Sequence, residues 1–143
     1  MTPDILAPAA LLALWSLVVL GWAAGVRLKA MSAAGIDMSE PPPGGRRGAD
    51  LEGILPDQVN WKAHNYTHLH EQPTVFYAVV AILAIAGAAT SLSVQLAWAY
   101  FGLRVIHSLI QGTVNYVPAR FLVFLVSTVC LAVLTVQAVM ATL

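Results

Sequence analysis

The chain has 143 residues, of which 59% are hydrophobic and only 10% are charged. A soluble domain usually carries about 25% charged residues, so most of the surface of this chain does not face water. Seven basic and seven acidic residues cancel, which argues against nucleic-acid binding and against a polybasic membrane patch. The single cysteine, Cys130, excludes an intrachain disulfide and is expected to be a small buried hydrophobe.

The first apolar segment covers residues 5–28 and is closed by Arg27 and Lys29. The four residues before it carry no positive charge, and a run of about 22 apolar residues is long enough to cross a bilayer. These features predict a retained membrane helix and not a cleaved signal peptide. Pro8 falls in the first turn, where a helix tolerates proline.

A polar stretch, residues 29–56, follows the first segment and contains a cluster of prolines and glycines. No hydrophobic periodicity survives in it, and the cluster excludes a continuous helix. We therefore expect a loop at the membrane surface, in which Leu51, Ile54 and Leu55 make a short amphipathic contact.

Three further helical segments are predicted, with Asp57 as the N-cap of the first and a bend at Pro73. The short turns between them make neighbouring helices antiparallel. The fold class is an all-α membrane protein, a single domain (1–143) forming a four-transmembrane-helix up-down bundle with helices at 5–28, 57–89, 93–116 and 118–142. Basic residues gather around the first and third loops, so the positive-inside rule makes these loops cytoplasmic and both termini non-cytoplasmic.

The stretch Trp61–Tyr77 carries three of the four histidines at the start of the second membrane segment. His64, His68 and Glu71 are spaced i, i+4 and i+7, which places them on one helix face. That spacing also resembles a metal-ligand pattern, but no glutamate directly follows His64 as it does in zinc proteases. Hydrogen bonding or ligand binding is therefore favoured over a metal site.

The third segment carries a second polar group on one face. The face holds Arg104, His107, Ser108, Gln111 and Asn115, at offsets of 3, 4, 7 and 11 from the arginine. An arginine near the middle of a bilayer costs at least about 2.5–3.5 kcal/mol, so it needs an internal partner. Since Glu71 is the only acid in or near a membrane segment, we predict a Glu71–Arg104 pair or two groups that share one bound ligand. Alternatively, these polar groups only join helices by hydrogen bonds.

Together these features resemble the MAPEG family, the membrane-associated proteins in eicosanoid and glutathione metabolism. The resemblance covers nearly the whole chain and is greatest to an uncharacterised bacterial branch, whose second helix is similar to Asn65–Pro73. It implies a homotrimer of four-helix subunits in the bacterial inner membrane. It also implies that glutathione binds between neighbouring subunits near the cytoplasmic side.

Individual residues of this chain correspond to positions in the family pattern. In the second helix Glu71 matches the family glutamate, while His68 stands in place of an asparagine and His64 in place of a basic residue. In the third helix Arg104 matches the family arginine and His107 occupies a position where a tyrosine is usual. Arg120 lies close to the arginine that stabilises the thiolate in the leukotriene synthase.

Two functions follow from these residues. A guanidinium lowers the pKa of a nearby thiol, so Arg120 and Arg104 are the candidate catalytic residues of a glutathione transferase or peroxidase acting on lipophilic electrophiles. The candidate ligand-binding residues are Glu71, His68, His64, His107 and Gln111. The alternative is a non-catalytic lipid-binding or scaffold subunit that presents a lipophilic small molecule to a partner, and a metal- or proton-handling membrane protein is the third possibility.

Overall fold

The computed structural model describes residues 4–37, 39–40 and 42–143, and every regular element in these residues is a helix. The helices are α1 (Leu6–Ala33), η1 (Gly48–Leu51, a 3-10 helix), α2 (Asp57–His68), α3 (Gln72–Ile85), α4 (Ser91–Thr113) and α5 (Val117–Thr142). The all-helical class predicted from the sequence is therefore confirmed for the described part of the chain.

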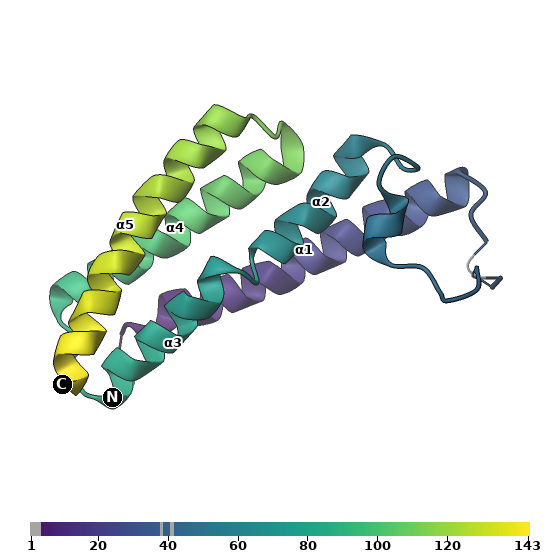
Figure 1. Ribbon diagram of the computed structural model, residues 1–143. Helices are drawn as coiled ribbons and strands as arrows, with labels where there is room; N and C mark the ends of the chain where they lie inside the picture. The colour runs from purple at the N-terminus through teal and green to yellow at the C-terminus, as the bar shows by residue number, and fades with distance from the viewer. Residues whose placement is uncertain (1–3, 38, 41) are drawn as a thin grey trace.

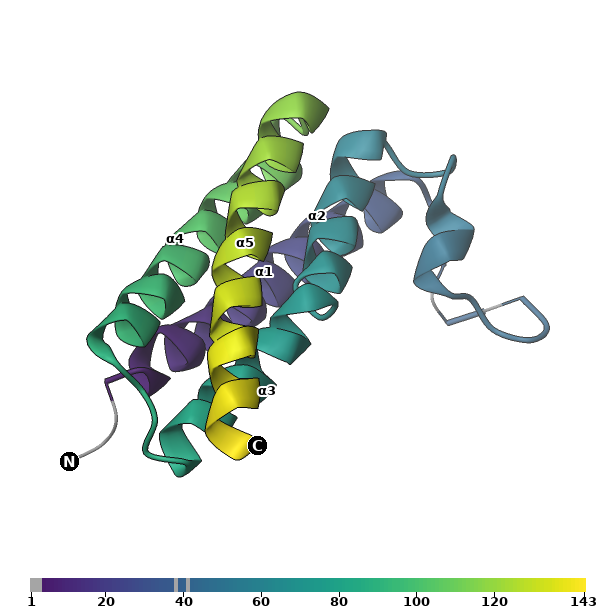
Figure 2. The ribbon, with the colours of Figure 1, turned by 60° about the vertical axis from the view of Figure 1, so that its left-hand side comes forward.

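The helices form two pairs that lie close together at one end and diverge at the other (Figures 1 and 2). One pair is α4 with α5, and the other is α1 with the consecutive helices α2 and α3. We call the end with the start of α1, the α3–α4 turn and the end of α5 the closed end. The open end holds residues 48–64 and 111–120, where the two pairs separate.

The outer faces of the molecule are apolar. By length and composition, α1 and α5 are long and apolar enough to cross a membrane. Their outward side chains include large hydrophobic groups such as Leu17 and Val129, which are 63% and 58% exposed. A soluble monomer rarely exposes apolar surface of this extent, whereas lipid accommodates it. Cys130 is buried, as predicted.

The second segment is interrupted, so the prediction of one continuous helix over residues 57–89 is wrong. Helix α2 ends at His68 and α3 begins at Gln72, with Glu71 as its N-cap. Pro73 lies in the first turn of α3 and has no N–H to donate to the preceding turn. The bend predicted at this proline is thus present as a complete break. Asp57 is the first residue of α2 and Pro56 is its N-cap, one position earlier than predicted.

The polar loop is shorter and more structured than the sequence indicates. Helix α1 continues to Ala33 instead of ending at residue 28, and η1 forms within the predicted loop. Leu51 and Leu55 are 4% and 3% exposed and pack with Met31 and Val59, while Ile54 is exposed. Two of the three residues predicted to make an amphipathic contact at the membrane surface are thus buried within the chain, against α1 and α2. This packing brings η1 to the open end.

Toward the closed end, hydrogen bonds and aromatic contacts join the helices. Thr90 and Ser93 form a capping box at the start of α4, and Ser93 Oγ donates to Gln137 Oε1 of α5 at 2.8 Å. The rings of Phe76 and Tyr100 stack with centroids 4.3 Å apart, and both side chains are fully buried. The first contact joins α4 to α5, and the aromatic stack joins the two helix pairs through α3 and α4.

Candidate functional site

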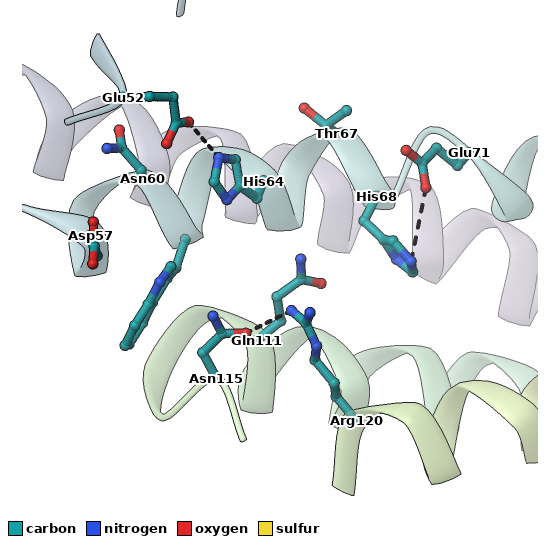
Figure 3. A pocket seen from close by; sticks show the side chains of 11 residues that line it. Glu52, Asp57, Asn60, His64, Thr67, His68, Glu71, Gln111, Asn115 and Arg120 are labelled. Atoms are coloured by element: carbon teal, nitrogen blue, oxygen red, sulfur yellow. Dashed lines mark hydrogen bonds and ion pairs between the residues drawn. The ribbon is translucent and has the colours of Figure 1, made fainter. Parts of the chain in front are cut away.

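A polar cavity of about 560 Å³ opens between the two helix pairs at the open end (Figure 3). Small-molecule sites commonly have volumes of about 300–1,000 Å³, so its size suits a ligand. Its wall comes from the segment after η1, from α2 and the α2–α3 break, and from the α4–α5 turn. The lining residues are Glu52, Asp57, Asn60, Trp61, His64, Thr67, His68, Glu71, Gln111, Asn115 and Arg120.

Five of the seven site residues predicted from the sequence line this cavity. They are His64, His68, Glu71, Gln111 and Arg120. The other two lie deeper: Arg104 is fully buried beneath His68, and His107 is buried beside it. The structure thus brings the two predicted polar groups together, although their contacts differ from those predicted.

The predicted Glu71–Arg104 ion pair is wrong. Arg104 Nη2 instead donates to His68 Nδ1 at 2.9 Å and to the His68 carbonyl oxygen at 3.1 Å. The Glu71 carboxylate is 62% exposed and its Oε2 lies 3.8 Å from His68 Nε2. The reason is the helix break: Glu71 becomes the N-cap of α3, and the His68 carbonyl, which accepts a long bond of 3.4 Å from the Glu71 backbone N–H, also accepts from the arginine.

His68 stands at the centre of the site. Its ring stacks on that of His107 with centroids 4.8 Å apart, and Phe124 of α5 packs edge-on at 5.6 Å. The ring is therefore held by contacts from α4 and α5 while one nitrogen faces Arg104 and the other faces Glu71. Its orientation is fixed by surrounding groups on three helices.

A second, smaller cavity of about 200 Å³ adjoins the polar one. Val117, Phe121 and Phe124 of α5 give it an apolar wall, and we call it the apolar cavity. His107 completes the lining together with His68, Gln111 and Arg120, and these last three also line the polar cavity. The site is therefore a polar and an apolar compartment that meet at three polar side chains.

Arg120 is held at this meeting point by Asn115. Its Nη1 donates to Asn115 Oδ1 at 2.6 Å. Asn115 was expected on the polar face of the third helix, but α4 ends at Thr113 and Asn115 follows in a left-handed turn with φ 49°. Asparagine tolerates that conformation better than most residues. Among the residues that line the polar cavity, Arg120 is the one arginine or lysine.

Gln111 carries an unpaired acceptor at the wall of the polar cavity. Its side chain is 6% exposed and turned into the polar cavity in Figure 3, yet its Oε1 has no hydrogen-bond partner in the described part of the chain. Buried polar atoms are nearly always paired, so an unpaired acceptor at a cavity wall fits a ligand that donates an N–H or O–H.

The outer wall of the polar cavity contains residues that the sequence did not single out. Glu52 Oε1 lies 2.5 Å from His64 Nε2 and forms a hydrogen bond or ion pair with it. This contact joins the segment after η1 to α2. Asp57 and Asn60 line the same wall. The sequence signal in this segment was the apolar spacing of Leu51, Ile54 and Leu55, which does not indicate a contact with α2.

The metal-site alternative receives no support from the geometry. His68 Nε2 lies 3.8 Å from Glu71 Oε2, but His64 Nε2 is bonded to Glu52, so the three predicted side chains do not converge on one point. Across residues 4–37, 39–40 and 42–143, no three His, Cys, Asp or Glu side chains form a group that could hold a metal ion.

Comparisons with known proteins give one match. The family model described as "MAPEG family" matches residues 5–140, which is nearly the whole chain. Searches of curated proteins and of solved structures found no match.

Proposed function

The chain belongs to the MAPEG family, a family of integral membrane proteins of glutathione and eicosanoid metabolism, and from that premise we propose that it conjugates glutathione to lipophilic electrophiles. The observation that carries the proposal is the junction of two unlike cavities at His68, Gln111 and Arg120. A transferase of this kind must hold a charged peptide thiol and an apolar partner in contact, and the two compartments suit these two substrates.

The polar cavity matches the groups of glutathione. The tripeptide carries two carboxylates, one ammonium group, two amides and a thiol. Glu71, Glu52 and Asp57 provide carboxylates for the ammonium group, and the unpaired Gln111 Oε1 provides an acceptor for an amide N–H. Arg120 provides the cation for an anionic group.

The chemistry assigned to Arg120 is stabilisation of the thiolate. The thiol loses its proton to water in the open cavity, and the guanidinium favours the resulting anion. The sulfur then forms a bond to the electrophilic carbon held in the apolar cavity. In a substitution the leaving group departs with its electron pair, and in an addition the neighbouring atom of the electrophile takes a proton. Val117, Phe121 and Phe124 contact the apolar substrate.

The proposed function includes a trimeric assembly and an orientation in the membrane. MAPEG proteins are generally trimeric, so we expect a homotrimer in which a neighbouring subunit closes the open side of the polar cavity. Arg27, Lys29, Arg46, Arg47 and Lys62 lie in or flank the first loop and so surround the open end. By the positive-inside rule this end faces the cytoplasm of a bacterium, where glutathione is available, and the electrophile enters from lipid.

A non-catalytic subunit that binds a lipophilic molecule is the second candidate. The observation that favours it is the burial of Arg104, one of the two predicted catalytic residues, which has 0% exposure and is bonded to His68. In such a protein the apolar cavity alone would bind a ligand, and glutathione would have no effect.

The test is the thermal stability of the purified trimer in detergent with and without millimolar glutathione. A ligand at 100 times its Kd stabilises a protein by about 2.7 kcal/mol, so the midpoint should rise in the wild type. The rise should be lost in Glu71→Gln and in Arg120→Gln. It should remain in Glu40→Gln and Arg46→Gln, which remove matched charges outside the cavity. An equal rise in all five proteins, or none in the wild type, would contradict the proposal.

A further inference from the structure

The contact between Arg104 and His68 defines the proton position on the histidine. A guanidinium carries only hydrogen-bond donors and remains protonated in proteins. Arg104 Nη2 lies 2.9 Å from His68 Nδ1, so Nδ1 must be the acceptor in this bond. In a neutral imidazole the proton is then on Nε2. The second bond from Nη2, to the His68 carbonyl at 3.1 Å, holds the arginine in that position.

The Nε2–H group faces the site. Nε2 is the ring nitrogen on the side of Glu71, 3.8 Å from Oε2, and His68 lines both the polar and the apolar cavity. A separation of 3.8 Å is too long for a hydrogen bond, so this donor is free for a ligand. The stacked His107 ring and the edge of Phe124 prevent the His68 ring from turning away.

We propose that Arg104 is a positioning residue that locks His68 in the Nε2–H tautomer, and that His68 donates this hydrogen to the thiolate sulfur at the junction of the two cavities. The ligand class rests on the proposed function, whereas the tautomer does not. His68 and Arg120 would then hold the same anion from α2 and α5. Arg104, predicted as a catalytic residue, acts through His68 and does not touch the substrate.

The same geometry excludes His68 as the base that removes the thiol proton. Its only lone pair is at Nδ1 and is occupied by Arg104. A second proton at Nδ1 would place two N–H groups face to face at 2.9 Å. The other charged or titratable groups around the ring are Glu71 on α3, Arg120 on α5 and His107 on α4. Two of the neighbouring groups are arginines, and they oppose a third positive charge on His68.

Nitrogen NMR on the full-length protein tests the tautomer without any ligand. Histidines are labelled with ¹⁵N in lipid nanodiscs at neutral pH, and the His68 signals are assigned by their loss in His68→Gln. The inference predicts a proton on Nε2 and none on Nδ1 in the wild type and in Arg104→Lys, which keeps a donor. A proton on Nδ1, a mixture of tautomers or a doubly protonated ring would overturn it.

Substitutions of His68 test the donor role. His68→Gln keeps an N–H donor, whereas His68→Phe keeps the aromatic contacts with His107 and Phe124 and removes the donor. A donor to a developing anion contributes about 10²-fold to a rate. We therefore expect conjugation to fall by about 10²-fold in His68→Phe and to recover largely in His68→Gln. Equal losses in both variants, with stability unchanged, would overturn the donor role.

The two experiments separate the possible failures. If wild-type protein neither binds glutathione nor conjugates it, the proposed function fails while the NMR result still decides the tautomer. If glutathione binds and the Nε2–H tautomer is absent, the proposed function stands and this inference is wrong.

Discussion

Two glutamines, one at each end of the molecule, differ in their hydrogen bonds. At the closed end Gln137 accepts a hydrogen bond from Ser93 at 2.8 Å and so joins α5 to the capped start of α4. At the open end Gln111 is buried, but its Oε1 has no partner in the described residues and faces a cavity. Both are polar side chains in a protein of a membrane family, where polar groups within the helices are rare and require an explanation.

Polar side chains therefore have two different roles in this bundle. A polar group that is paired within the chain contributes to the packing of helices, with a value of under about 2 kcal/mol. A polar group that is buried and unpaired lowers stability until a ligand pairs with it. By this criterion the closed end is scaffold and the open end is the binding site. Substitutions at the two ends should therefore differ in their effects on stability and on ligand binding.

The largest effect on stability is expected where Gly112 of α4 packs against Trp22 of α1. A Cβ added at Gly112 would lie 2.7 and 2.8 Å from ring carbons of Trp22 and 3.3 Å from Asn65 Nδ2. Gly112→Ala must therefore displace the Trp22 ring or push α4 away from α1, at a cost of about 1–3 kcal/mol in unfolding free energy.

The matched control for that substitution is Gly102→Ala on the same helix. A Cβ at Gly102 meets nothing within 4 Å, so alanine should stabilise the helix by about 0.5–1 kcal/mol. Thermal unfolding in detergent measures both variants. Similar midpoints for the two would contradict the close approach of α1 and α4.

The next prediction compares Gln137, whose side chain is hydrogen-bonded, with Gln111, whose Oε1 has no partner in the described residues. Gln137→Leu removes the acceptor of Ser93 and should lower the unfolding free energy by about 1 kcal/mol. Gln111→Leu removes an unpaired acceptor, so stability should stay equal or rise while glutathione binding weakens by about tenfold. Unfolding curves and glutathione titrations of the same two proteins measure this. If Gln111→Leu is the less stable protein, the division between the two ends fails.

The tether between Glu52 and His64 should have a small effect on stability. Both side chains are about half exposed, and exposed ion pairs contribute about 0–1 kcal/mol. His64→Ala should leave the unfolding midpoint nearly unchanged while amide hydrogen exchange of residues 48–52 becomes faster. An unchanged exchange rate would mean that the burial of Leu51 and Leu55 alone holds η1.

The smallest effect concerns Asp50 in η1. Hydrogen bonds from the Arg47 backbone N–H and from its side chain lower the pKa of this carboxyl below 3.8. Because the folded pKa is depressed, the carboxylate stabilises η1 fully above pH 3.8, and this contribution is lost as the pH falls through the folded pKa. An NMR titration of Asp50 measures it, and a pKa above 3.8 would contradict the bonded geometry.

The sequence predicted the helical class and most helix positions because apolar runs and turn residues are local signals. It also predicted five lining residues of the polar cavity, since three of them share a short polar stretch. The sequence did not predict the features that depend on tertiary contacts. The break after His68 redirected Glu71, and the left-handed Asn115 ended α4 early. The approach of Phe124 to His68 depends on how α5 packs, which no local pattern encodes.

The central claim is that a polar and an apolar cavity meet at Arg120, and a glutathione thioether with a linear alkyl chain on sulfur tests it most directly. Such a molecule should occupy both cavities, so wild-type protein should bind S-hexylglutathione at least about tenfold more tightly than glutathione, given about 0.8 kcal/mol per buried methylene. Val117→Trp, which fills the apolar cavity, should remove this gain and leave glutathione binding unchanged. Equal affinities for the two ligands in the wild type would contradict the two-cavity site.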